Sequence, residues 1–140
     1  MKLEIFATTA LLSTVFIAAP VRAENPAHVR QLIETRECMG CDLSGANLNG
    51  AHLIGADLRN ANLEGASLID ANLEGADLTG ANLQEANLFK AFATGATMNE
   101  VDLTGANLQD ARLYTVEMDG ATIAGADFRG AKLYGANLFN

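Results

Sequence analysis

The sequence predicts an all-β solenoid, a single rod of about five stacked coils with a short α-helical cap before it. Three observations predict this fold. Residues 41–140 consist of 20 successive repeats of five residues, without an insertion or a deletion. The central residue is Leu in 15 units and apolar in the others, and the first residue is Ala in 17. Gly takes the last position in 12 units. A repeat of this regularity outweighs local propensity.

A period of five suits neither standard element. On an α-helix five residues advance about 500°, so the leucines would drift around every face. On a straight strand an odd period would place them alternately on opposite faces. All leucines share one side only if the chain runs extended for about three residues and then turns, where Gly, or Asn60, Asp70 and Asp110 in its place, accepts a positive φ. If each turn is roughly a right angle, four units close a coil of 20 residues, and coils stack at a strand spacing of about 4.8 Å.

The unit Ala-Asn/Asp-Leu-x-Gly, seen in residues 46–50, resembles the pentapeptide-repeat family, and the resemblance covers residues 41–140. It implies a right-handed quadrilateral β-helix. Together with an apparent export signal and a short capping helix, it also implies a cyanobacterial protein of the periplasm or thylakoid lumen.

The first part of the chain divides into two segments before the repeats. Residues 1–23 have the pattern of a signal peptide, because an apolar run is followed by small residues at Val21 and Ala23, where a signal peptidase reads. An uncleaved anchor or a buried helix is the alternative. Without this segment the formal net charge of −8 becomes −9, since Lys2, Glu4 and Arg22 leave with it.

Residues 24–40 are predicted to form the capping helix and its junction with the repeats at 41–140. Asn25 followed by Pro26 is typical of a helix start, and apolar side chains then share one face up to about Glu37. These apolar side chains are those of Val29, Leu32 and Ile33.

The last coil has no such cover in the sequence, so its apolar side chains should face solvent beside an unpaired backbone edge. These side chains are Ile123, Phe128, Leu133 and Leu138. Such an end favours a homodimer in which two C-terminal coils stack.

Cys38 and Cys41 allow three interpretations. A structural disulfide would fix the cap to the first coil in an oxidising compartment. A redox-active pair is the second interpretation, although no thioredoxin-like βαβ pattern surrounds it. A zinc site that adds His28 or His52 is the third, with a poor set of ligands.

Residues 20 apart should stack in columns, and two features of these columns stand out. Ala93 interrupts a column of leucines, and Met98 in the same coil is flexible enough to fill the space. On the outside, apolar and aromatic side chains predict a candidate interaction patch, with scattered surface residues as the alternative. The patch consists of Ile69, Phe89, Phe92, Tyr114 and Tyr134. A neighbouring face is acidic through Asp57, Asp77 and Glu117.

These features predict a non-catalytic structural or protein-interaction module, with an unknown protein partner and no cofactor. The acidic surface disfavours direct binding of nucleic acid, and no catalytic constellation or metal cluster is evident. After cleavage of the signal the chain would not be an integral membrane protein. One alternative is an acidic DNA mimic that binds topoisomerases, as some family members do in the cytoplasm. Another is a thiol–disulfide partner that uses Cys38 and Cys41.

Overall fold

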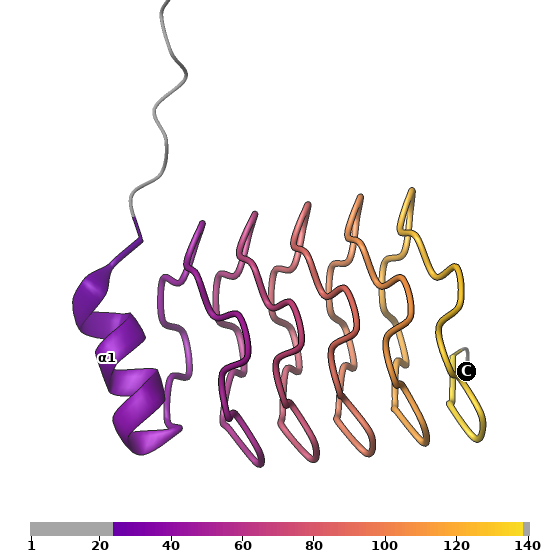
Figure 1. Ribbon diagram of the computed structural model, residues 1–140, viewed down its shortest axis with the longest axis horizontal. Helices are drawn as coiled ribbons and strands as arrows, with labels where there is room; N and C mark the ends of the chain where they lie inside the picture. The colour runs from indigo at the N-terminus through magenta and orange to yellow at the C-terminus, as the bar shows by residue number, and fades with distance from the viewer. Residues whose placement is uncertain (1–23, 139–140) are drawn as a thin grey trace, which may run out of the picture.

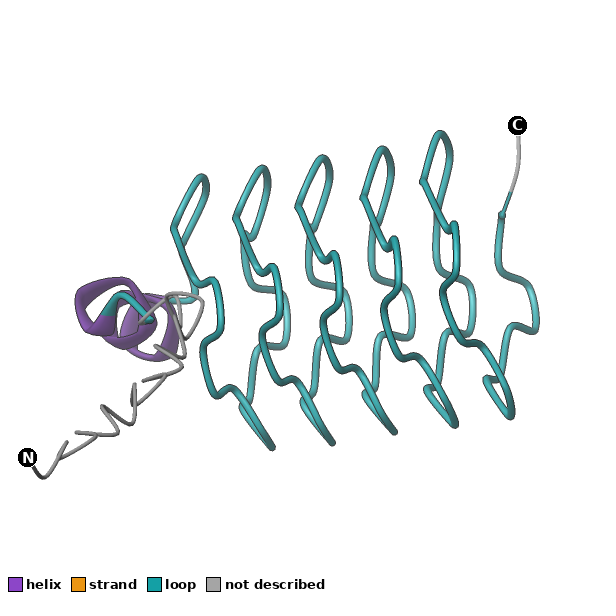
Figure 2. Ribbon diagram, turned by 90° about the horizontal axis from the view of Figure 1, so that it is seen from above, coloured by secondary structure: helices purple, strands orange, loops and turns teal. Residues whose placement is uncertain are grey.

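The backbone follows the same path every 20 residues. In the computed structural model, which describes residues 24–138, parallel bridges join residues 20 apart, from Glu37–Asp57 to Glu117–Asn137. The coils lie side by side along the long axis with helix α1 at one end, as Figures 1 and 2 show from two directions. The described residues form isolated bridges rather than named strands. A turn at every fifth residue leaves one bridging residue per side of each coil, which is too short for a continuous ladder.

Each side of a coil is tied to the next coil by the same three backbone hydrogen bonds. The N–H of Leu43 donates to the carbonyl of Asn62 at 2.7 Å, and the N–H of Asn62 donates back to the carbonyl of Cys41 at 2.8 Å. The N–H of Gly45 donates to the carbonyl of Glu64 at 2.8 Å. The pattern then repeats along the chain, so that stacking satisfies the backbone groups that the turns leave open.

The turns place every fifth residue in the left-handed region. Ala46 N–H donates to the carbonyl of Leu43 at 3.0 Å, and Gly45 between them has φ 67°. The sequence predicted this conformation for Asn60, Asp70 and Asp110, and the structure confirms it. The same conformation is imposed on four residues that favour it less. These are Glu85, Lys90, Glu100 and Thr115, with φ between 52° and 56°.

The Asn or Asp at the second position of the unit supports the turn. Its side-chain oxygen accepts the N–H two residues later, as Asn47 does from Asn49 at 3.2 Å and Asp102 does from Thr104 at 2.9 Å. Such Asx turns are a known preference of these residue types. The strong Asn/Asp signal of the repeat is therefore structural, a role that the sequence analysis did not assign.

The leucines fill the interior. Those from Leu43 to Leu113 are at most 2% exposed, and Ala93 and Met98 are also fully buried. In the last coil the inward side chains are only half-buried, because no further coil covers them. These are Ile123, Phe128, Leu133 and Leu138.

Helix α1 spans Pro26–Thr35 and lies over the first coil (Figure 1). It begins at Asn25, whose side chain accepts from the N–H of Ala27 at 3.1 Å, and it ends where Arg36 turns left-handed at φ 59°, slightly before the expected end at Glu37. Within this helix the side chain of Leu32 is fully buried, whereas that of Ile33 is 51% exposed. The sequence analysis placed Ile33 on one face with Leu32, but Ile33 does not share its burial, because adjacent helical residues point about 100° apart. The predicted signal peptide, residues 1–23, lies outside the described residues.

The segment around α1 also caps the open edge of the first coil. In later coils the N–H of the second residue in a unit donates to a carbonyl of the previous coil. No coil precedes the first one, so the N–H groups of its second residues need other acceptors. Instead, Asp42 N–H donates to Nδ1 of His28 at 2.9 Å, and Asn47 N–H donates to Oε2 of Glu24 at 3.2 Å. Side chains thus replace a missing coil, as the end of a solenoid requires.

We expect Thr115→Gly to stabilise the protein by about 1 kcal/mol, because a β-branched residue at positive φ carries a steric cost that glycine does not. Urea unfolding followed by circular dichroism measures the difference. The matched control is Gly75→Thr, at a turn with φ 62° and open space around a new Cβ atom, which should lose a similar amount. Equal stability of Thr115→Gly and the parent would contradict strain at this turn.

Candidate functional site

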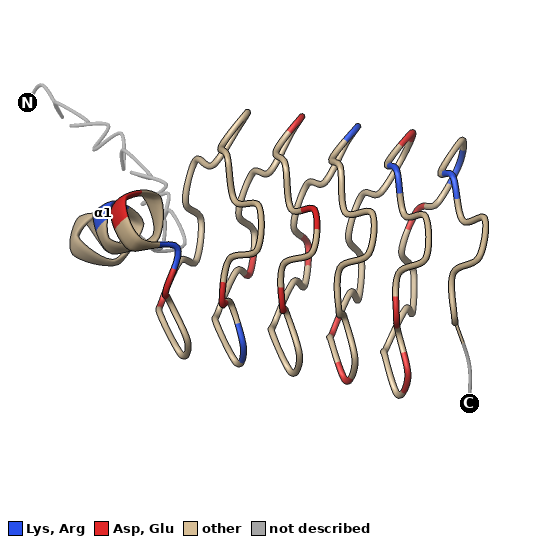
Figure 3. Ribbon diagram, turned by 90° about the horizontal axis from the view of Figure 1, so that it is seen from below, with Lys and Arg blue, Asp and Glu red and all other residues tan. Residues whose placement is uncertain are grey.

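An open pocket of about 490 Å³ lies along one side of the solenoid and draws on successive coils. Its lining combines three cationic, two acidic and two aromatic side chains. The cations are Lys90, Arg112 and Lys132; the acids are Asp70 and Asp110; the aromatic residues are Phe92 and Tyr114. Blue and red segments both occur along one edge of the C-terminal half in Figure 3, while the opposite edge there is red.

Aromatic rings support two of the cations. The guanidinium carbon of Arg112 lies 4.7 Å from the centroid of the Phe92 ring, and Nζ of Lys90 lies 5.0 Å from that of Phe89. Both distances fit a cation–π contact. Such a contact restrains the cation without using its hydrogen-bond donors.

The other two basic side chains of the repeats are already neutralised. Arg59 forms an ion pair with Asp57 at 2.6 Å, and Arg129 forms one with Asp127 at 2.7 Å. Within residues 24–138, neither Lys90, Arg112 nor Lys132 takes part in such a pair. Among the repeat residues that the structure describes, the Lys and Arg side chains without an ion pair therefore all line this pocket.

Hydrogen bonds lower the pKa of three carboxyl groups outside the pocket. The Arg59 side chain lowers the pKa of Asp57, and the Arg129 side chain strongly lowers the pKa of Asp127. For Asp102 the main cause of the lowered pKa is the Thr104 hydroxyl, which donates to it at 2.6 Å. These carboxylates are charged, and their hydrogen bonds serve the turns of the solenoid.

The predicted interaction patch overlaps this pocket in two residues. Phe92 and Tyr114 line the pocket, while Ile69 and Phe89 are half-buried and outside its lining. Tyr134 is 85% exposed and also outside it.

The cationic character of the pocket was missed by the sequence analysis. The signal was present in the columns, because Arg112 and Lys132 are 20 residues apart and Lys90 stands midway between Asp70 and Asp110.

The C-terminal end forms a second, apolar pocket of about 170 Å³. The four side chains predicted for end-to-end contact line it together with Met118. They are Ile123, Phe128, Leu133 and Leu138. In the described part of the chain, the N–H groups of Ile123, Phe128 and Leu133 find no backbone acceptor, unlike their counterparts in earlier coils. This end therefore offers both apolar surface and free hydrogen-bond donors.

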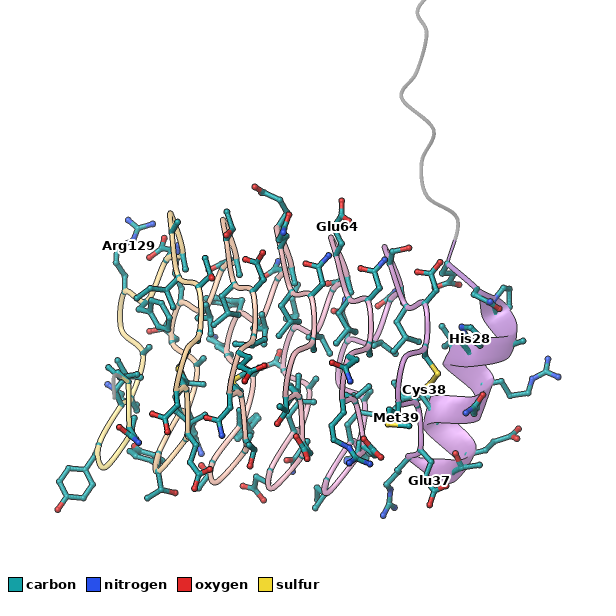
Figure 4. The ribbon with its side chains drawn as sticks, turned by 180° about the vertical axis from the view of Figure 1, so that it is seen from behind. His28, Glu37, Cys38, Met39, Glu64 and Arg129 are labelled. Carbon is teal, nitrogen blue, oxygen red and sulfur yellow. A yellow bond between two sulfur atoms is a disulfide. The ribbon has the colours of Figure 1, made fainter. Side chains whose placement is uncertain are left out.

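The two cysteines form a disulfide beneath α1. Cys38 is fully buried and Cys41 is 5% exposed, and Sγ of Cys38 lies 3.4 Å from the carbonyl oxygen of His28. Figure 4 shows the disulfide against the helix near His28. Nδ1 of His28 already accepts the N–H of Asp42. Among residues 24–138 no three His, Cys, Asp or Glu side chains are grouped to hold a metal ion.

The stacked coils, the filled interior and the exposed pockets define a solenoid protein that presents surfaces from a repeated backbone. The chain belongs to the pentapeptide repeat family, whose model of eight repeat copies matches residues 41–80, 81–120 and 103–139. Proteins of this family form right-handed quadrilateral β-helices and are generally non-catalytic structural or interaction modules. This confirms the resemblance found in the sequence.

Solved structures of the same family are similar to this chain. A pentapeptide repeat protein of Nostoc Pcc 7120 is 25% identical, with 84% of this chain and 96% of that chain covered and a TM-score of 0.55. One from the thylakoid lumen of Arabidopsis thaliana is 31% identical, with 76% and 68% covered and a TM-score of 0.48. Comparison with curated proteins finds no match. Across residues 24–138, no helix has the length and apolar character needed to cross a bilayer.

We expect acid to destabilise the protein as pH falls below about 4, the usual range of an unfolded Asp. A carboxyl group whose pKa is lower in the folded state stabilises that state fully above the unfolded value, and this contribution is lost as pH falls through the folded value. Asp57, Asp102 and Asp127 are such groups. The melting temperature measured from about pH 6 to about pH 2 reports the loss.

Asp102→Asn should reduce this fall, because Asn can still accept the Thr104 N–H but does not titrate. Glu74→Gln, at an exposed side chain outside these contacts, is the matched control and should follow the parent. Identical acid profiles for Asp102→Asn and the parent would show that this carboxylate contributes nothing.

Proposed function

We propose that this protein is an exported, non-catalytic interaction module that pairs with a second copy of itself through its C-terminal coil and presents its sides to another protein. The observation that carries the proposal is the difference between its two ends. Helix α1 covers the first coil, and the side chains of Glu24 and His28 accept two of its N–H groups. The last described coil instead exposes an apolar pocket, and its N–H groups find no backbone acceptor.

A second copy suits this C-terminal end in both respects. Apolar surface contributes about 25 cal/mol per Å² removed from water, and an open backbone edge is a template for pairing with another chain. A two-fold dimer would bring the same end of each copy together, so that one pocket covers the other. Phe128 and Leu133 lie in the contact in this arrangement.

Export is supported by two features. The first 23 residues have the composition of a signal peptide. The disulfide between Cys38 and Cys41 is of the kind that persists in an oxidising compartment such as a periplasm or a thylakoid lumen. Because both sulfur atoms are buried beneath α1, a thiolate has little access to them, which disfavours the thiol–disulfide partner as a function.

Light scattering tests the dimer. The purified processed protein should be a dimer at high concentration, and Phe128→Glu should convert it to a monomer because a carboxylate cannot be buried unpaired in the contact. Ile54→Glu, which makes the same charge change at an exposed site in the first coil, should leave the dimer intact. Circular dichroism shows whether each variant is folded. A wild-type protein that stays monomeric at its highest soluble concentration would refute the pairing.

Cell fractionation tests export and separates it from DNA mimicry. We expect the protein in an exported fraction, with the mass of a chain whose first residue is Glu24, because the signal pattern predicts cleavage after Ala23. A cytoplasmic protein that keeps residues 1–23 and inhibits DNA supercoiling by gyrase would instead support the acidic DNA mimic.

A further inference from the structure

We propose that the pocket formed by Lys90, Arg112 and Lys132 binds an acidic peptide segment of a partner protein, with the carboxylates of that segment against Arg112 and Lys132. The inference rests on the proposed role as an interaction module and gives it a partner of stated chemistry. It uses a different surface from the C-terminal pairing, so each can be tested without the other.

The charge of the rod directs an acidic ligand to this pocket. The protein beyond residue 23 carries a formal net charge of −9, so most of its surface repels anions. The three unpaired cations of the repeats nevertheless come from successive coils and line one pocket, while Arg59 and Arg129 are held by aspartates. An anionic segment is therefore attracted to these three cations more than to the acidic faces of the repeats.

Arg112 is positioned before any ligand arrives. Its guanidinium lies over the ring of Phe92 at 4.7 Å, and its side-chain donors make no hydrogen bond within residues 24–138. A guanidinium placed in this way can offer a carboxylate two parallel N–H donors. Because the ring already restricts the side chain, less conformational entropy is lost on binding.

Asp70 and Asp110 indicate a peptide rather than a chain of phosphates. They belong to the same corner column as Lys90, one coil before it and one coil after it. Their carboxylates repel a continuous polyanion such as nucleic acid, but they can accept hydrogen bonds from peptide N–H groups. In a peptide with spaced acidic side chains, the carboxylates can pair with the cations of the lining, and the backbone N–H groups can donate to its two aspartates.

The dimensions agree with an extended segment. The lining runs from Asp70 to Lys132, about three coil spacings of about 4.8 Å each, which is about 14 Å. An extended chain covers this length in about four residues, at about 3.3 Å per residue. The volume of about 490 Å³ leaves room for side chains over Phe92 and Tyr114.

Tyrosine fluorescence offers a direct test, because the chain has no Trp and only two Tyr residues. In a Tyr134→Phe background, Tyr114 in the pocket is the sole tyrosine. We expect saturable quenching when the protein is titrated with an acetylated, amidated peptide of alternating Glu and Leu, and weaker binding as salt is raised. The same peptide with Gln in place of Glu should bind at least about tenfold more weakly.

Paired variants localise the effect. Arg112→Gln with Lys132→Gln should weaken binding of the Glu peptide at least about tenfold. Arg59→Gln with Arg129→Gln makes the same change in net charge outside the pocket and should change affinity less than about twofold. Melting curves show that both double variants are folded.

Three outcomes would overturn the inference: no saturable binding of the Glu peptide, equal loss in the two double variants, or inorganic phosphate or a single-stranded oligonucleotide competing as well as the peptide. Phe128→Glu, which tests the C-terminal pairing, should bind the peptide as the parent does. A failure of peptide binding with an intact dimer would therefore refute the pocket alone, and the reverse result would refute the pairing alone.

Discussion

The fold depends on one constraint, a backbone in the left-handed conformation at each fifth residue. It bends the chain once per unit, so that every Leu and the Ala before it face the same interior. It also returns the backbone after 20 residues to the position where its N–H and carbonyl groups meet those of the coil before. The turns, the core and the ladder of hydrogen bonds thus all follow from one local conformation, which accounts for 20 units in succession without an insertion.

Within the rod, each coil is covered and hydrogen-bonded by its neighbours, but the first and last coils each lack a neighbour on one side. At the first coil, α1 covers the apolar interior with Leu32, and Glu24 and His28 accept N–H groups that have no coil to receive them. The disulfide joins Cys38, beneath the helix, to Cys41 in the first unit. The last coil has no comparable cover in the described chain, so Phe128 and its neighbours remain half-buried. The described coils therefore have one end covered by α1 and one end at which apolar side chains are open.

The same regularity decides how the outer surface can acquire chemistry. The second position of the unit is largely committed to the turn, since Asn and Asp there accept the N–H two residues later. Where the second residue departs from Asn and Asp, as at Phe92, Arg112 and Lys132, the side chain is released to form a surface. Because residues 20 apart stack, a few such departures in one column suffice to build a pocket, with no change in the backbone beneath.

The sequence by itself determined the family, the solenoid, the 20-residue register and the inward leucines, because these follow from a short-range rule repeated without error. It also placed Phe92, Arg112 and Lys132 in one column. Only the tertiary structure decided that Ile33 faces outward, that Ile69 and Phe89 lie outside the pocket, and that Arg59 and Arg129 are neutralised whereas Arg112 is not. These outcomes depend on side-chain direction and on neighbours in adjacent coils, which a period along the chain does not encode.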